Sequence, residues 1–388
     1  MAFRGQTHDR SLRPRARTRP AAATRGVRPW VATGLTAALL AGGFTRQRGT
    51  LEDDAGITHE RRQAGGSPHD RGRGRHARTP SDIPARGWKD VVLRVYRNIS
   101  DDRILAIAAG GAYYIILAIF PALAALVAIY GLFADPASIQ SVVTSLSSVL
   151  PSSVVDIVEG QLHALASQPR TSLGATFAVS LGISLWSANS GLKAIFDALN
   201  IVYHEGEKRS FLKLNAESLA FTVAALVSGI IGLALVALLP PAVDYLGGEL
   251  GIGGPLALVL KIGRWPLLLV AVALAIAVVY RYGPSREKPR WRWVTWGSSA
   301  AAILWLAASL LFSWYSANFA SYNKTYGSLA AAIVFMTWVW ISVIAVLLGA
   351  ELDAEMEHQT VRDTTTGQPR PLGARGAFVA DTVGRAQE

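Results

Sequence analysis

One uncharged run near the C-terminus indicates a membrane protein more strongly than any other feature of the chain. Between Lys324 and Glu351 lie 26 residues without a charged side chain, and most of them are apolar. At 1.5 Å rise per residue, about 20 apolar residues in a helix cross the hydrocarbon core of a bilayer. A soluble protein could bury one such helix, but similar runs recur five more times here. The pattern therefore predicts an all-α, polytopic membrane protein with six transmembrane helices.

The apolar runs and their flanks predict the limits of a membrane domain over residues 86–357. We expect transmembrane helices over residues 104–133, 171–192, 218–243, 255–280, 293–323 and 326–350. Residues 86–103 have apolar side chains at helical spacing and arginines on the other faces, which predicts an interfacial amphipathic helix. Two further amphipathic helices are expected on the membrane surface within residues 136–169.

The two ends of the chain are polar. Residues 1–90 hold 18 Lys and Arg against 8 Asp and Glu, whereas the remaining residues hold 20 against 19. We expect a disordered, Arg-rich tail over residues 1–85 and a polar tail without fixed structure over 358–388. An apolar patch at residues 30–44 is interpreted as part of the first tail, with a signal peptide and a seventh span as alternatives. The tail lacks a nucleic-acid-binding module, so we expect it to meet anionic lipid headgroups rather than nucleic acid.

The basic residues between the predicted spans indicate the orientation. Lys and Arg are concentrated before the first span, between the second and third, and between the fourth and fifth. The other connecting segments hold few of them. Because basic loops stay in the cytoplasm, both termini are predicted to be cytoplasmic, in a multi-pass protein of the cell membrane.

The sequence contains no catalytic or metal-binding constellation that we recognise. The chain has no cysteine, and its seven histidines form no HxH or HExxH pair. No glycine-rich segment ends in the Gly-Lys-Ser/Thr of a nucleotide-binding loop. We therefore expect no enzyme activity, no catalytic residue, no metal and no cofactor. The acids lie at the ends of the predicted spans, which argues against a proton pump.

Hydroxyl side chains follow one face of two predicted spans. Ser180, Ser184, Ser187 and Gly191 share a face of the second span, and Ser309, Ser313 and Ser316 share a face of the fifth. One interpretation is close helix packing. The other is a polar path between two halves related as an inverted repeat, in which the second and fifth spans correspond. The residues expected to line such a cavity are Ser184, Ser187, Asn189, Ser313 and Asn318.

Three motifs resemble signatures of the YihY/BrkB family of membrane proteins. The first combines residues 111–114 with 120–123, the second runs from residue 185 to 211, and the third combines residues 326–329 with 348–352. Together they cover about residues 90–357, with one departure at Ala118, where the family pattern has serine. The residues that carry the resemblance are Tyr113, Tyr114, Pro121, Trp186, Gly191, Tyr326, Gly327, Gly349 and Glu351.

The resemblance implies an integral protein of the cytoplasmic membrane with about six spans. Members of the family have carried a virulence-factor name and a ribonuclease label, and the lack of a metal constellation argues against the second. We expect a transporter-like or envelope-maintenance protein that moves a lipid or small envelope component, with the lipid bilayer as its partner. The alternative is a structural or partner-binding membrane protein without transport. Substrate, coupling ion and oligomeric state cannot be predicted from the sequence.

Overall fold

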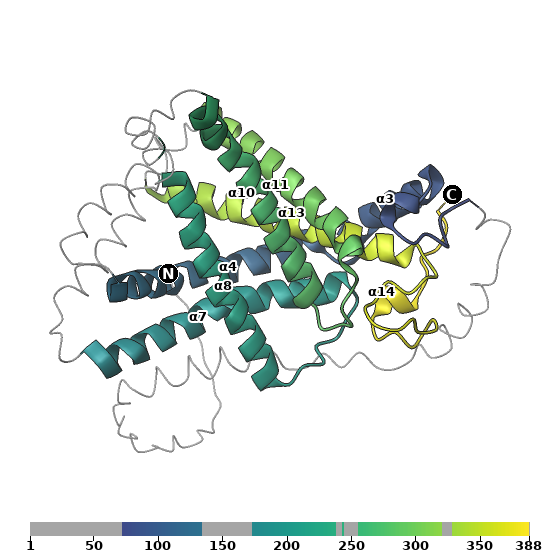
Figure 1. The fold of residues 1–388 in the computed structure, drawn as a ribbon, viewed down its shortest axis with the longest axis horizontal. Coiled ribbons are helices and arrows are strands. Elements are labelled where there is room, and N and C mark those ends of the chain that lie inside the picture. The colour runs from purple at the N-terminus through teal and green to yellow at the C-terminus, as the bar shows by residue number, and fades with distance from the viewer. Residues whose placement is uncertain (1–71, 134–172, 238–242, 244–254, 320–327, 388) are drawn as a thin grey trace, which may run out of the picture. The chain divides into compact units, whose positions relative to one another are not determined.

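The computed structural model describes residues 72–133, 173–237, 243, 255–319 and 328–387. In these ranges the regular structure is helical, apart from an isolated β-bridge between Pro289 and Thr365. The short elements are η2 (Pro80–Asp82), α3 (Ala85–Asp101) and α14 (Phe378–Asp381). The long helices are α4 (Ile104–Phe133), α7 (Leu173–Val202), α8 (Phe211–Ala237), α10 (Pro255–Tyr282), α11 (Trp291–Phe319) and α13 (Ser328–His358) (Figure 1).

Five of the described helices, α4, α8, α10, α11 and α13, are long and apolar enough to cross a membrane. The all-helical prediction is confirmed for the described residues. The second predicted span differs, because α7 is not among these five helices: it has 30 residues, but its serines, Asn189 and Lys193 lower its mean hydropathy. The patch at residues 30–44 and the surface helices expected within residues 136–169 lie outside the described ranges.

The helix α13 contacts more of the other helices than any of its described neighbours. It packs against α4, α7 and α11, and also contacts α3 and α14. The other close pairs are α4 with α7, α7 with α8, and α10 with α11. Buried indole N–H groups need acceptors, because the hydrocarbon core offers none. Three indoles bond across α13 contacts: Trp338 to Ser309 Oγ (3.2 Å), Trp305 to Ser342 Oγ (3.1 Å) and Trp340 to the Leu105 carbonyl (3.0 Å).

Two glycines bring α11 and α13 into backbone contact. A Cβ added at Gly349 would lie 2.5 Å from the Ala301 Cβ and 2.6 Å from the Gly297 carbonyl oxygen. Tyr280 of α10 reaches the same contact and donates its hydroxyl to the Val346 carbonyl. Within a membrane, small residues that allow such close approach are a main source of helix packing.

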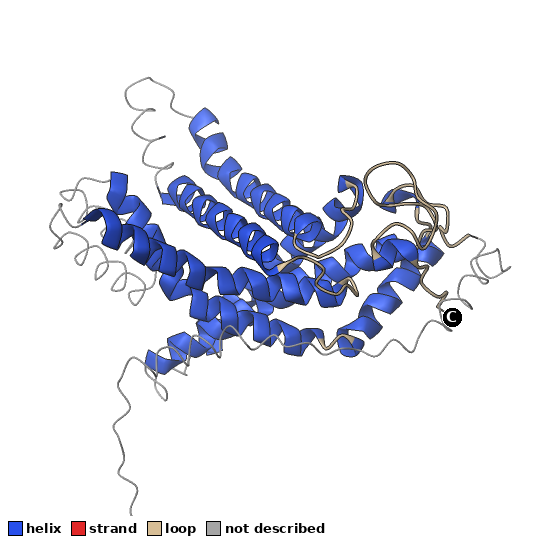
Figure 2. Ribbon diagram, turned by 90° about the horizontal axis from the view of Figure 1, so that it is seen from below, coloured by secondary structure: helices blue, strands red, loops and turns tan. Residues whose placement is uncertain are grey.

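The described loops gather at one end of the long helices (Figure 2), which we call the polar end. It comprises residues 72–84, α3, the α7–α8 link (203–210), the α10–α11 link (283–290) and residues 351–387. On α3, which was predicted to lie on the membrane surface, Asp90, Val91 and Arg94 are buried, whereas Val92 and Tyr96 are exposed. The helix therefore packs one face against the protein and leaves an apolar face open.

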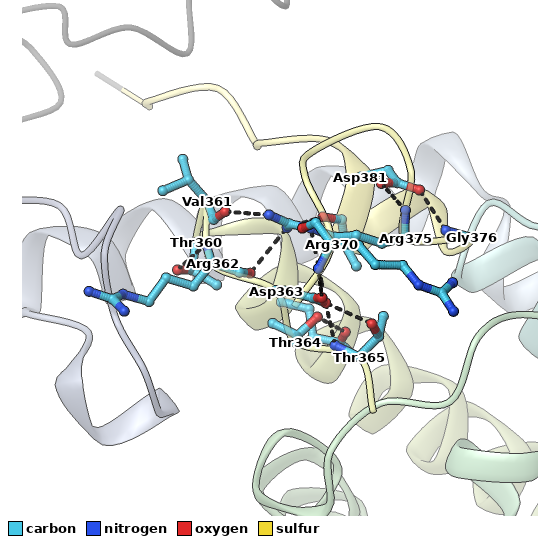
Figure 3. Close-up of polar contacts among 12 residues, drawn as sticks. Thr360, Val361, Arg362, Asp363, Thr364, Thr365, Arg370, Arg375, Gly376 and Asp381 are labelled. Atoms are coloured by element: carbon cyan, nitrogen blue, oxygen red, sulfur yellow. Dashed lines mark hydrogen bonds and ion pairs between the residues drawn. The ribbon is translucent and has the colours of Figure 1, made fainter. Parts of the chain in front are cut away.

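The C-terminal segment 359–387 is folded, which differs from the unstructured tail expected from its composition. The Arg375 guanidinium donates to the backbone carbonyls of Val361, Arg362, Arg370 and Ala380 (Figure 3). Asp381 accepts from the backbone N–H groups of Arg375 and Gly376. The segment is thus held by side-chain bonds to the backbone together with the burial of Ala377, Val379 and Ala380, and composition does not reveal such bonds. Residues 72–84, expected to be disordered, are packed as well, with Ala77 and Ile83 buried.

The contact at Gly349 leads to a test of the helix packing. We expect Gly349→Ala to lower the free energy of unfolding by about 2 kcal/mol, because the added methyl group would overlap the α11 backbone. The matched control is Gly229→Ala on α8, where a Cβ would meet no atom within 4 Å. That control should be neutral or slightly stabilising, since alanine favours helix over glycine. Thermal unfolding of the purified proteins in detergent measures both, and equal melting temperatures would contradict the close contact.

Candidate functional site

The side chains predicted to line a cavity lie on two helices with different neighbours. The helix α7 packs against α4, α8 and α13, whereas α11 packs against α10 and α13. On α7, Ser184 and Ser187 are half-buried and Asn189 is fully buried, whereas Ser313 on α11 is exposed. The side chain of Asn318 lies outside the described part of the chain. The five residues stay a prediction: α7 carries three of them, with Asn189 on a different side of the helix from Ser184 and Ser187.

Asn189 faces α8 and belongs to a buried polar group between the two helices. The Thr222 hydroxyl lies within hydrogen-bonding distance of the Asn189 side-chain oxygen (3.3 Å) and of the Ser218 carbonyl (2.9 Å). In the described part of α8, the buried side chains are Asn215, Ser218 and Thr222, which share one face at i, i+3 and i+7. We call Asn189, Asn215, Ser218 and Thr222 the α7–α8 polar seam. Asn189 could be identified from the sequence, but the three polar residues of α8, of which Thr222 bonds to Asn189, were missed, although their helical spacing was an available signal.

The outer face of α8 is apolar. Val223, Val227, Ile230 and Ile231 are exposed. This helix therefore carries polar side chains inward and apolar side chains outward, the reverse of a helix on the surface of a soluble protein. Such an arrangement is favourable only where the surroundings of the outer face are themselves apolar.

Two family-motif residues take part in helix contacts on the N-terminal half of the bundle. A Cβ at Gly191 would lie 3.2 Å from the Ala118 Cβ and 3.4 Å from the Ile115 Cα, so α7 crosses α4 closely at this point. Ala118 is buried there. Pro121 is half-buried within α4. The alanine that departs from the family pattern thus fills a packing position beside Gly191.

Three aromatic family-motif residues lie in the described helices: Tyr113 and Tyr114 on α4, and Trp186 on α7. Tyr113 and Trp186 are exposed, and Tyr113 forms an edge contact with Tyr114 at 5.6 Å between ring centroids. The Lys193 ammonium lies 5.1 Å above the Trp186 ring. Tyr326 and Gly327 lie outside the described residues. The exposed rings of Tyr113 and Trp186 suit contact with lipid.

The acidic residues at the C-terminal end of α13 are buried. Glu351, Asp353 and Glu357 are fully buried and Glu355 is 5% exposed. We call these four the acidic end of α13. A buried carboxylate is costly unless charged or hydrogen-bonding groups meet it. Each of the four must therefore be matched by a neighbouring segment, and sequence analysis had singled out only Glu351.

The helix α3 supplies partners for two of these carboxylates. Arg94 donates to the Glu355 carboxylate and, at 2.7 Å, to the side-chain oxygen of Gln359. The Asn98 amide lies between two acids and donates to Glu355 (2.9 Å) and Glu351 (3.2 Å). The amphipathic helix is thus fixed to the end of α13 by polar bonds.

The two remaining acids, Asp353 and Glu357, bond to α11 and to the α10–α11 link. Arg286 and Glu357 form an ion pair at 2.7 Å, with both side chains fully buried. The Thr364 hydroxyl also donates to Glu357 (2.8 Å), and the Arg286 guanidinium lies 4.8 Å above the Tyr203 ring. Asp353 accepts from the backbone N–H of Gly297 at 2.7 Å. The α10–α11 link, the C-terminal segment and α11 are all held by one helix end.

A second polar group joins the α7–α8 and α10–α11 links. Arg209 donates to Glu207 (2.7 and 2.8 Å), Glu217 (2.9 Å) and the Gly283 carbonyl (2.9 Å). Asn200 donates to Glu207 (3.1 Å) and accepts from the Ser285 backbone N–H (2.7 Å). Burial acts to raise the pKa of Glu207, but the bonds from Arg209 and Asn200 outweigh it and hold this pKa at about 2. Glu207 is therefore a carboxylate at neutral pH. It accepts from Arg209 and Asn200, which also bond to the α10–α11 link.

Within the described ranges, no group of three or more His, Asp or Glu side chains is placed to hold a metal ion. Most buried polar side chains of the described residues form two groups, the α7–α8 polar seam and the polar end, and in both they make hydrogen bonds between helices or links.

Comparison with known proteins relates this architecture to a family. The chain matches the family described as Virulence factor BrkB over residues 95–372. The ribonuclease-like protein YfkH of Bacillus subtilis is 32% identical over 250 residues, which cover 63% of this chain and 86% of that protein. A UPF0761 membrane protein of Psychromonas ingrahamii is 27% identical over 274 residues, covering 69% of this chain and 87% of the relative.

A further UPF0761 membrane protein, from Albidiferax ferrireducens, is 24% identical over 282 residues. The aligned region covers 70% of this chain and 64% of that relative, so the chain spans just under two thirds of its length. No solved structure matches the chain.

The buried ion pair at the acidic end allows a test by double-mutant cycle. We expect Arg286→Met to lower the free energy of unfolding by about 3 kcal/mol, because Glu357 is left buried beside an uncharged side chain. The double variant Arg286→Met/Glu357→Leu should regain part of that loss. Lys213→Met is the control, since Lys213 lies 3.9 Å from Glu217 in an exposed pair of small expected value. Unfolding in mixed detergent measures all three, and equal losses in the two Arg286 variants would refute the coupling.

The depressed pKa of Glu207 predicts the pH dependence of one contribution to stability. A carboxyl with a lowered folded-state pKa stabilises the fold above its unfolded pKa, and that contribution is lost as pH falls. The loss should extend from about pH 4.5 down to about pH 2. We expect Glu207→Gln to be less stable than the original protein by about 1 kcal/mol at pH 7, after allowance for partial exposure. Melting temperatures of the two proteins should converge as pH falls through this window, and a constant gap would exclude the assignment.

Proposed function

The chain belongs to the Virulence factor BrkB family, and we propose that this multi-pass membrane protein moves a lipid or other small envelope component across or within the cell membrane. The observation that carries the proposal is the reversed polarity of α8, whose buried side chains in the described part are Asn215, Ser218 and Thr222. Polar side chains inside a membrane bundle need hydrogen-bonding partners, which another helix or a passing substrate can supply. The half-buried Ser184 and Ser187 add polar side chains on another side of α7, the side that Gly191 shares.

We propose that α7 is a sixth span, in addition to the five helices with clear membrane character. Each of the six long helices has one end at the polar end: α4, α8 and α11 start there, and α7, α10 and α13 finish there. This alternation supports six crossings. The polar end carries Lys208, Arg209, Arg286 and Lys288, so the proposal places it in the cytoplasm with both termini.

The helix contacts support a repeat of three helices. If α4, α7 and α8 correspond to α10, α11 and α13, then the α4–α7 contact corresponds to α10–α11, and α7–α8 corresponds to α11–α13. The contact between α13 and α4 likewise corresponds to that between α8 and α10. Three spans per half would make the halves inverted, an arrangement that transporters share.

A ribonuclease activity is not part of the proposal. The name of YfkH refers to ribonuclease likeness and is a statement about that protein. We propose that the present chain performs no catalysis, because its sequence lacks the ligand pairs that a metal-dependent hydrolase requires. The remaining alternative is a structural or partner-binding protein, in which the polar side chains of α7 only join helices.

Cysteine labelling separates transport from a purely structural role, because the chain has no cysteine of its own. We expect Ser184→Cys, Ser187→Cys and Asn189→Cys to react with a membrane-impermeant thiol reagent added to vesicles. Leu311→Cys, on the exposed apolar face of α11, and Ala301→Cys, in the buried α11–α13 contact, serve as controls and should stay unlabelled. Labelling of Ser313→Cys would extend the path to α11. Protection of all the α7 positions would favour the structural alternative and refute transport along α7.

A further inference from the structure

The α7–α8 polar seam contains hydrogen-bonding atoms that no group meets within the described part of the chain. Asn215 uses its amide N–H on the Phe211 carbonyl (2.7 Å), and Ser218 uses its hydroxyl on the Leu214 carbonyl (2.7 Å). Two buried atoms are left over, the side-chain nitrogen of Asn189 and the side-chain oxygen of Asn215. Each buried polar atom without a partner costs about 1–3 kcal/mol. A membrane helix would avoid that cost with apolar side chains unless another molecule met these atoms.

The chemistry of the seam limits what that molecule can be. Once the local bonds are formed, the seam offers N–H donors at Asn189 and acceptors at Asn215, Ser218 and Thr222. The four seam residues carry no charge, so an ion among them would lie in an apolar region without a counter-charge. Arg209 and Glu217, near the start of α8, pair with each other at 2.9 Å. A neutral hydroxyl group, which donates one hydrogen bond and accepts two, matches the remaining donors and acceptors.

We propose that the α7–α8 polar seam is a binding site for neutral hydroxyl groups, supplied by water or by the glycerol headgroup of a lipid. From Asn215 to Thr222 the row is about 10 Å long, at 1.5 Å per residue. This length is comparable to that of a short file of waters or of the hydroxyls of one glycerol group. The proposal that the ligand is a lipid rests on the proposed function, whereas the proposal that the seam binds a hydroxyl group does not. The site begins about one turn into α8 and leads toward Asn189 within the bundle.

The first experiment measures lipid preference. Native mass spectrometry of the purified full chain gives affinities for dioleoylphosphatidylglycerol and for dioleoylphosphatidylmethanol, which has the same phosphodiester charge but lacks the headgroup hydroxyls. We expect the original protein to favour the glycerol lipid by about fivefold, the value of one or two hydrogen bonds. Asn189→Leu and Thr222→Val should abolish the preference. Thr222→Val is nearly isosteric and keeps the test valid if Asn189→Leu does not fold.

The control is Ser309→Ala, which removes a membrane hydroxyl from the α11–α13 contact instead of the seam. It should keep the fivefold preference. A preference that survives in both Thr222→Val and Asn189→Leu would overturn the assignment of the lipid to the seam.

The second experiment identifies water as the ligand. Millisecond hydroxyl-radical footprinting oxidises side chains beside bound water even where bulk solvent does not reach. Phe196 and Phe221, whose rings lie 5.3 Å apart between α7 and α8, are the reporters. We expect rapid oxidation of Phe221 in the original protein and at least a threefold lower rate in Thr222→Val. This result without lipid preference would assign the hydroxyl to water.

Absence of both signals in the original protein would overturn the proposal. The outcome is separable from that of cysteine labelling. A seam that binds hydroxyl groups while the α7 cysteines stay protected would leave the binding site standing and remove transport. Labelled α7 cysteines, with neither a lipid preference nor oxidation of Phe221, would support transport and remove the binding site.

Discussion

Burial of the acidic end of α13 is the constraint on which the polar end depends. Its four carboxylates cannot be left without partners in a dry environment. Together they bind four segments: Glu351 and Glu355 meet α3, Asp353 meets α11, and Glu357 meets the α10–α11 link and the C-terminal segment. Because the acids are two residues apart, successive ones point to opposite sides of the helix. One helix end therefore fixes four segments around it.

Different forces hold the helices and the polar end together. Between α11 and α13 the backbones touch at Gly297 and Gly349, and indole–serine hydrogen bonds add direction to that contact. At the polar end, arginines and amides replace small residues as the means of association. The two regions meet on the same helix, because Gly349 and Asp353 are one turn apart and both contact Gly297. A displacement of α11 along α13 would therefore disturb the glycine contact and the carboxylate together.

The sequence was sufficient to predict the helices and their approximate limits, but not what joins them. Residues 104–133 match α4, since charges at Arg103 and Asp135 bound the apolar run. The predicted span at 218–243 starts within α8, which begins at Phe211 and includes Lys213 and Glu217, residues that charge counting placed in the loop. Asn189 could be singled out as a polar residue in a span, but its partner Thr222 could not, because hydroxyls are common in membrane helices. Pairs such as Arg94 with Gln359 join residues separated by 265 positions, and no local pattern reveals them.

The contacts of α3 have a consequence for how the protein is made. This helix leaves the ribosome before any of the long helices, yet Arg94 and Asp90 bond to residues 355–387, which are synthesised at least 261 residues later. During translation these two buried charges have no native partners from the later chain, so α3 must wait at the membrane surface, where its exposed Val92 and Tyr96 can hold it. Assembly of the polar end is then a late, post-insertional step that closes a very long loop, and such closure is slow. An incomplete nascent chain would have its helices in the bilayer before it had its polar end.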